Sequence, residues 1–189
     1  MKTSFYKKEE LEGLGFRSIG INVLISRNAN FYTPEKITIG NNVRIDDFCI
    51  LSGEITLGSN IHISAHSMLY GSKGIIMEDY SGLSPRTTLF SASDDFSGDF
   101  MVGSMVPQEF TNVRGGVVII KKFCQLGAGS IVLPKVVLEE GSVTGAMSLV
   151  NKNLEPWYIY AGIPAVKIKE RKKKLIELAR EYEQKYNGI

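Results

Sequence analysis

Residues 37–70 read ITIGNNVRIDDFCILSGEITLGSNIHISAHSMLY. An aliphatic residue recurs at every sixth position, and glycine or another small or acidic residue usually follows it. Four positions after each aliphatic residue stands a second apolar or small residue. Neither an α-helix, with a period of about 3.6, nor a flat strand, with a period of about 2, explains this repeat. The two series expected to point inward are Ile39, Ile45, Leu51, Leu57, Ile63, Leu69 and Val43, Cys49, Ile55, Ile61, Ser67.

The same period extends in both directions along the chain. It shifts by two residues after Leu69, breaks between Ser93 and Gly116, and resumes until Val150. Three hexads match one turn of a triangular prism whose interior is filled by the aliphatic side chains. The chain is therefore predicted to be all-β, a parallel β-helix of about six coils, rather than a β-sandwich of short strands. The further interior positions are Ile19, Ile25, Phe31, Met77, Leu83, Leu89, Ile120, Leu126, Val132, Leu138, Thr144 and Val150.

Both ends of the chain depart from the repeat. Residues 1–18 are predicted to form an N-terminal segment with a short helix near 7–14. The charged stretch there follows a polar start at Thr3 or Ser4 and ends near Gly15, which is typical of a helix terminus. Residues 19–166 form the β-helix, with 93–116 as an inserted loop. Residues 167–189 are predicted to form an amphipathic C-terminal helix. The basic run from Lys169 to Lys174 is either a solvated face of that helix or a contributor to anion binding.

Composition excludes several classes of protein. The 189 residues include 22 Lys and Arg against 20 Asp and Glu, so binding of nucleic acid through bulk charge is not expected. Cys49 and Cys124 are too few for a disulfide framework, and we expect buried thiols in a cytoplasmic protein. The charged N-terminal stretch lacks the apolar core of an export signal. No apolar run reaches the roughly 18 residues of a membrane span, so no membrane insertion is expected.

Three stretches of the C-terminal half resemble a known family. They are GAGSIVLP at 127–134, TGAMSLVNKNLEPW at 144–157 and YAGIPAVKIK at 160–169. With the repeat, they make residues 19–171 similar to the left-handed β-helix acyltransferases, also called hexapeptide-repeat enzymes. Residues 74–98 look like sugar acetyltransferases of the galactoside and maltose type. They look more like bacterial enzymes of surface-polysaccharide and lipopolysaccharide biosynthesis that N-acetylate amino-sugar nucleotides. The resemblance implies acetyl-CoA as co-substrate and a homotrimer with sites between subunits.

The catalytic residues are open to two interpretations. Galactoside-type relatives carry a histidine base where this chain has Asp94, and an unperturbed aspartate, with a pKa of about 3.9, is a weak base for a hydroxyl. The two histidines of the chain, His62 and His66, precede the loop. His62 lies in an outward slot of the repeat and His66 near a polar active-site position of the relatives. Each can instead be a surface or corner residue.

The missing loop histidine favours an amine acceptor, because a neutral amine needs less help from a base than a hydroxyl does. We therefore expect N-acetylation of a nucleotide-linked amino-deoxyhexose, with O-acetylation of a sugar hydroxyl as the alternative. Asp95, Arg86 and Phe96 are expected to contact the acceptor; turn formation by Asp95 and loop packing by Phe96 are the simpler roles. A non-catalytic scaffold is a further alternative. A carbonic-anhydrase-like metal site of three histidines does not fit, and no metal is expected.

The donor site is expected on the later coils. Lys152, Lys167 and Lys169 match family positions near the phosphates of the coenzyme, although solvated surface lysines would look the same. Small residues must line a narrow channel for pantetheine, and Ala128, Ala146 and Gly162 fit that need. Trp157 either stacks near the adenine or anchors the terminal helix.

Overall fold

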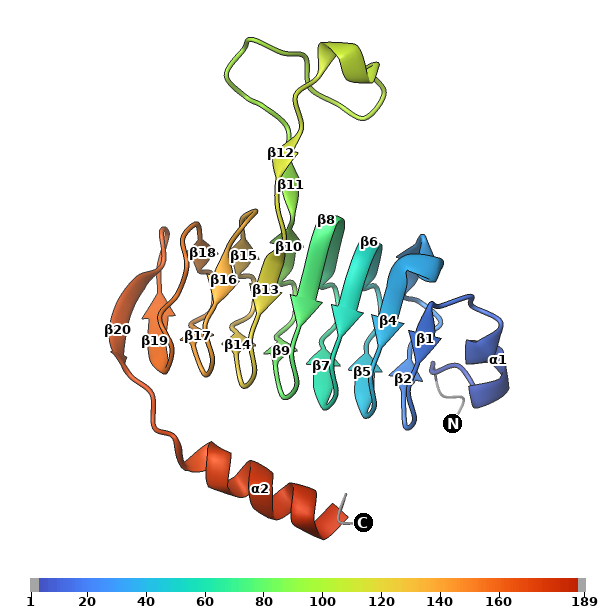
Figure 1. Ribbon diagram of the computed structural model, residues 1–189, viewed down its shortest axis with the longest axis vertical. Coiled ribbons are helices and arrows are strands. Elements are labelled where there is room, and N and C mark those ends of the chain that lie inside the picture. Colours follow the sequence, from blue (N-terminus) through green and yellow to red (C-terminus); the bar gives the residue numbers. More distant parts are fainter. Residues whose placement is uncertain (1–3, 187–189) are drawn as a thin grey trace.

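The computed structural model describes residues 4–186, so parts of the predicted terminal segments, 1–3 and 187–189, lie outside the described residues. Strands stack into a column of parallel coils, with α1 (Lys8–Glu12) at one end. A loop projects from the column, and α2 (Lys174–Tyr186) lies along its opposite side (Figure 1). The predicted β-helix with one extruded loop and two terminal helices is confirmed. No helix within 4–186 has the length and apolar character that crossing a bilayer requires.

The column has three faces, and each coil contributes a short strand to each of them. Strands β6 and β8 are long because they continue around one edge, from the third face to the first. The first face contains β1 (Ser18–Ile19), β4 (Ile37–Ile39), the second halves of β6 (Ile50–Leu57) and β8 (Met68–Met77), β13 (Val118–Ile120) and β16 (Val137–Leu138).

The other two faces have the same parallel register. The second face contains β2 (Leu24–Ile25), β5 (Val43–Ile45), β7 (Ile61–Ile63), β9 (Gly82–Leu83), β14 (Gln125–Leu126), β17 (Val143–Thr144) and β19 (Tyr158–Ala161). The third face contains β3 (Asn30–Tyr32), the first halves of β6 and β8, β10 (Thr88–Phe90), β15 (Ile131–Val132) and β18 (Leu149–Val150). A short 3₁₀ turn, η1 (Pro34–Lys36), precedes β4.

The interior is the predicted series of side chains. Every interior residue expected from Ile39 to Val150 is at most 7 % exposed, and Ile25 is completely buried. Ile19 and Phe31 are partly buried against this core. The thiols of Cys49 and Cys124 are buried, and burial raises the pKa of each to about 11. Both cysteines are free, so they act as small core residues, as expected.

Two of the three edges are columns of residues in the left-handed region. The histidine edge, between the second and third faces, consists of Phe48, His66, Arg86, Gly129 and Met147. The asparagine edge, between the first and second faces, begins with Asn22, Asn42 and Asn60, whose side-chain amides bond one another at 2.7 and 3.1 Å. It continues through Tyr80, Phe123, Gly141 and Trp157. A left-handed residue at each corner lets the chain turn sharply between faces.

The third edge carries the inserted loop. The loop leaves the column after β10 and returns at β13. Its two legs pair as β11 (Ala92–Ser93) and β12 (Arg114–Gly115), which are antiparallel, and its distal part contains the turn η2 (Gln108–Phe110). Figure 1 shows the loop extending well away from the column.

The C-terminal segment differs from the expected helix over 167–189. Residues Val166–Glu170 form β20, which pairs antiparallel with β19, and α2 begins later, at Lys174. The alternation of Val166, Lys167, Ile168 and Lys169 has the period of a strand, and it covers the sheet edge left open by the last coil. Of the apolar residues predicted at helical spacing, those from Leu175 onward lie in α2.

Replacing Ile63 by alanine tests the core. Its side chain is completely buried, so Ile63→Ala should lower the free energy of unfolding by about 2–5 kcal/mol. Ile21 is 72 % exposed, and Ile21→Ala should change it by no more than about 0.5 kcal/mol. Denaturant unfolding measures both; equal losses would contradict an interior built on the hexad aliphatics.

Candidate functional site

The histidine edge gathers five of the predicted site residues on neighbouring coils. A backbone N–H at each corner donates to a carbonyl of the coil before it, so the corners are stacked in register. Along this edge, the Arg86 N–H donates to the Ala65 carbonyl at 3.1 Å, and the Met147 N–H donates to the Ala128 carbonyl at 2.8 Å. The predicted site residues at or directly beside this edge are the corner residues His66 and Arg86, together with Ala128, Ala146 and Gly162 on the later coils.

Two side chains of the edge can contact an acceptor. His66 is exposed, and its ring stacks on Phe48 with centroids 5.0 Å apart. Arg86 is exposed one coil further on. Both residues have a φ near +60°, so their side chains project from a corner rather than from a face. An imidazole and a guanidinium therefore project from corners of successive coils, where an anionic or polar ligand could contact both.

Small residues continue the same edge on the later coils. Ala128 and Ala146 are exposed at equivalent positions, and the Gly162 carbonyl accepts a hydrogen bond from the Leu149 N–H at 3.0 Å. At Gly129 a Cβ would lie 2.6 Å from the Met147 sulfur, so a larger residue there would require the Met147 side chain to move. Apart from Met147, this part of the edge exposes mainly backbone and small side chains, as a narrow pantetheine channel would require.

His62 has a carboxylate partner that the sequence did not predict. It lies on β7, is half exposed, and its Nε2 is 2.7 Å from Asp46 Oδ2. Arg44 donates from Nε to the other oxygen of Asp46 at 2.7 Å. Burial alone would raise the pKa of Asp46, but the hydrogen bonds from Arg44 and His62 outweigh it and lower the pKa. The ring of His62 is therefore oriented by an ionised carboxylate, and its other nitrogen is not held by that contact.

Asp94 and Phe96 lie at the far end of the third face, at the root of the loop. They line a cavity of about 370 Å³ together with Phe90, Leu133 and Pro134. Asp94 is half-buried, whereas Phe96 is 77 % exposed. The cavity has mainly apolar walls and one carboxylate at its border, which suits a deoxysugar that carries an amine.

Asp95 points away from that cavity. Its carboxylate is 7 % exposed and accepts hydrogen bonds from residues of both loop legs. The hydrogen bond from the Ser97 backbone N–H is the main reason that the pKa of Asp95 is lowered. Both oxygens are engaged within the chain, so the geometry favours a role in holding the loop over the expected contact with an acceptor.

The three lysines predicted for the coenzyme phosphates are not gathered in one place. Lys152 is exposed after β18, whereas Lys167 and Lys169 lie on β20. The ammonium of Lys167 bonds Glu155 at 2.6 Å and lies 3.9 Å from the Tyr158 ring centroid. The hydrogen bond to Glu155 raises the pKa of Lys167. Lys152 and Lys169 are therefore more available to a phosphate than Lys167 is.

Trp157 belongs to the asparagine edge, away from the alanine channel. Its ring lies 6.2 Å from Phe123, and the Lys173 ammonium lies 5.5 Å above it, just before α2. The guanidinium of Arg171 donates to the carbonyls of Phe123 and Gly141 at 2.7 and 2.9 Å. Of the two predicted roles, this geometry favours anchoring of the terminal helix.

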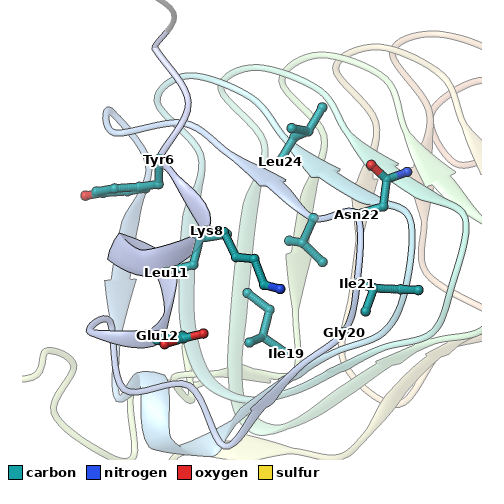
Figure 2. Close-up of a pocket in the computed structure, with 10 residues that line it drawn as sticks. Tyr6, Lys8, Leu11, Glu12, Ile19, Gly20, Ile21, Asn22 and Leu24 are labelled. Atoms are coloured by element: carbon teal, nitrogen blue, oxygen red, sulfur yellow. The ribbon is translucent and has the colours of Figure 1, made fainter.

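A cavity of about 420 Å³ at the N-terminal end contains none of the predicted site residues. Figure 2 shows that its walls come from Tyr6, α1 and the first coil, with the Lys8 side chain extending toward Ile19. Over residues 4–186, no three His, Cys, Asp or Glu side chains are grouped so that they could hold a metal ion. The histidine edge and the root of the loop are therefore the better candidate site.

Comparison with known proteins identifies close relatives, although no family model matches the chain. The dTDP-4-amino-4,6-dideoxy-D-glucose acyltransferase of Escherichia coli is 45 % identical over 172 residues, which are 89 % of this chain and 90 % of the relative. The crystal structure of AntD, an N-acyltransferase from Bacillus cereus, in complex with dTDP and 3-hydroxybutyryl-CoA has a TM-score of 0.96 and 51 % identity, and it covers 98 % of this chain and 100 % of AntD.

Further solved structures extend these relationships. AntD has been crystallised as S84A with dTDP-4-amino-4,6-dideoxyglucose and coenzyme A, and as D94N with dTDP and coenzyme A. The hexapeptide-repeat acetyltransferase VCA0836 of Vibrio cholerae, at 18 % identity and a TM-score of 0.55 over 88 % of this chain and 80 % of its own, shares the fold. Since close identity extends over nearly the full length of both chains, this protein belongs to the family of acyltransferases that includes the E. coli dTDP-4-amino-4,6-dideoxy-D-glucose acyltransferase and AntD.

Proposed function

We propose that this protein transfers an acyl group from a coenzyme A thioester to the amino group of a nucleotide-linked amino-deoxyhexose, with dTDP-4-amino-4,6-dideoxyglucose as the first candidate. The 51 % identity to AntD over 98 % of the chain carries the proposal. Acetyl is the acyl group that we expect from the resemblance of residues 74–98. The 3-hydroxybutyryl-CoA in the AntD complex makes a longer acyl group the main competitor.

Two residues varied in AntD have the same type and number in this chain. Since AntD matches 97–98 % of this chain, we propose that Ser84 and Asp94 are equivalent to the residues replaced in its S84A and D94N variants. Here Ser84 lies two residues before Arg86 on the histidine edge, and its N–H donates to the Leu126 carbonyl at 2.9 Å. Sequence reasoning missed Ser84, because a serine next to a corner looks like any small spacer of the repeat. Its place beside Arg86 supports an acceptor-side role.

The reaction needs little from the protein beyond alignment. The lone pair of the sugar amine attacks the thioester carbonyl, the carbon–sulfur bond breaks, and an amide forms. One proton leaves the nitrogen, and the departing thiolate gains one. Asp94 can accept a hydrogen bond from the amine and so hold its lone pair toward the carbonyl. His62 is the alternative proton acceptor, because Asp46 orients its ring.

We propose that a complete site requires more than one copy of the chain, in the homotrimer that the resemblance implies. Ser84 and Arg86 precede β10, whereas Asp94 comes after it, so they lie at opposite ends of the third face. A strand advances about 3.3 Å per residue, so one small sugar cannot contact both ends. The histidine edge of one subunit against the loop of its neighbour would bring them together. We also propose that the enzyme works in the cytoplasm and that its product enters surface-polysaccharide synthesis, as the resemblance of residues 74–98 implies.

The first test is an acceptor and donor panel. The purified protein should release free thiol from acetyl-CoA in the presence of dTDP-4-amino-4,6-dideoxyglucose, and mass spectrometry should show the amide. Simple galactosides should give no release, since their hydroxyls need a stronger base. Release with galactosides alone would support O-acetylation, and no stabilisation of the protein by any coenzyme A thioester would support a scaffold.

Asp94 and His62 can be separated by substitution. Asp94→Asn should lower kcat/KM by about 10² or more, because the neutral amide holds the amine less firmly than the carboxylate does and a small misplacement of the lone pair is costly. His62→Ala should lower it less than about tenfold if Asp94 has this role. Asp99→Asn, an exposed change in the same loop, is the control. If His62→Ala lost more activity than Asp94→Asn, the role in activating the amine would belong to His62 instead.

Mixing two inactive variants tests the shared site. Arg86→Glu reverses the charge on the histidine edge, and Asp94→Ala removes the carboxylate at the loop. If each site takes its edge and its loop from different subunits, mixed oligomers regain a substantial part of wild-type activity, because some interfaces pair two intact halves. No recovery in mixed oligomers of confirmed composition would show that one chain supplies both residues.

A further inference from the structure

Asp95 is the one charged side chain that is buried among residues 4–186. It lies at the root of the inserted loop, and its carboxylate has three partners. Oδ1 accepts from the Ser97 backbone N–H at 2.9 Å. Oδ2 accepts from the Asn112 side-chain amide at 2.7 Å and from the Arg114 guanidinium at 2.8 Å. A buried carboxylate is costly unless it is fully hydrogen-bonded and paired, and this one is.

These partners come from both legs of the loop. Ser97 belongs to the outgoing leg, whereas Asn112 and Arg114 belong to the returning leg. The backbone pairing of β11 with β12 involves two residues on each leg, so the Asp95 contacts begin where that pairing ends. Beyond them, most side chains of the loop are exposed, including Met105 at 95 %. Asp95, Asn112 and Arg114, which we call the loop clasp, therefore join the legs close to the column.

The loop clasp also determines where the neighbouring side chains lie. Asp94 and Phe96 flank Asp95 in sequence, and both line the cavity of about 370 Å³ against Phe90, Leu133 and Pro134. Asp95 itself does not line this cavity, because its carboxylate turns to the returning leg and caps the turn that begins at Phe96. Fixing Asp95 thus fixes the backbone position of the adjacent Asp94.

We propose that Asp95 is a positioning residue for acceptor binding, and that it acts through the loop clasp to hold Asp94 and Phe96 at the acceptor cavity. The proposal rests on the proposed function. Under this proposal Asp95 does not contact the acceptor directly, in contrast to the expectation from the sequence, because both of its carboxylate oxygens already accept hydrogen bonds within the chain. It also separates two adjacent aspartates by role: Asp94 meets the substrate, and Asp95 holds the loop.

Steady-state kinetics with Asp95→Ala, Arg114→Ala and the double variant test the proposal. Each single variant should raise the acceptor KM or lower kcat by about tenfold, since small displacements of a reacting group are costly. The KM for acyl-CoA should stay within about twofold, because the donor contacts expected at Ala128, Ala146 and Gly162 lie on the rigid column and not on the loop. The double variant should lose no more than the worse single variant, as expected for two partners of one interaction. Asp95→Asn keeps one acceptor oxygen and should fall between wild type and alanine.

Hydrogen exchange of the loop and an exposed control complete the experiment. Asp95→Ala should speed amide exchange in 92–115 and leave the coils unchanged, whereas Asp99→Ala should match wild type in kinetics and exchange. Faster exchange with unchanged acceptor kinetics would overturn the proposal, because the clasp would then be only structural. Equal rises in the KM for the acceptor and the KM for acyl-CoA would also overturn the proposal, because the effect would then not be specific to acceptor binding. A wild-type protein that acylates no amino sugar would instead refute the proposed function, and the positioning role with it.

Discussion

One constraint sets the placement of every other side chain: each hexad must bury one aliphatic residue in a narrow interior. Ile45, Ile63 and Leu83 stand above one another inside the second face and are almost completely buried. A slip of one residue would turn a whole face inside out, exposing aliphatic groups and burying charges. Arg44 and His62, which alternate with these residues, must therefore point to solvent. The packing of the buried aliphatic residues thus determines which charged and polar side chains the column presents to solvent.

The edges escape this constraint, and the candidate site lies on them. A corner residue in the left-handed region contributes little to the interior, so His66 and Arg86 can vary in size and charge at small cost in packing. On the later coils the corner residues are Gly129 and Met147, preceded by the exposed Ala128 and Ala146, so the edge there leaves room along the backbone for an extended ligand. One repeating architecture thereby supplies both a polar stretch and a narrow apolar stretch, one after the other, along a single line.

Features that arise from periodicity were predictable from the sequence, whereas features that arise from contacts between coils were not. The interior residues, the exposure of His62 and the position of the loop come directly from the phase of the repeat. The pairing of His62 with Asp46, 16 positions earlier, depends on how two side chains lean across neighbouring strands, and no spacing rule encodes it. Residues 167–170 were expected to be helical, from the helix-favouring composition of the segment and the helical spacing that begins at Ile168, but the open sheet edge beside them prevailed over propensity.

The division into a rigid column and a projecting loop explains why a buried charge is tolerated at Asp95. Fixing the backbone of one residue costs about 1–2 kcal/mol of conformational entropy, and an unordered loop would impose that cost on every acceptor that binds. The loop clasp orders the root of the loop during folding, so acceptor binding need not do so.

Since the pKa of Asp95 is lowered, its carboxylate stays ionised at pH values where an ordinary aspartate is protonated. Its contribution to stability is therefore present at neutral pH and is lost only as the pH falls through that lowered pKa. Neutral pH also leaves part of an amine unprotonated, so the loop is ordered under the same conditions in which the acceptor can react.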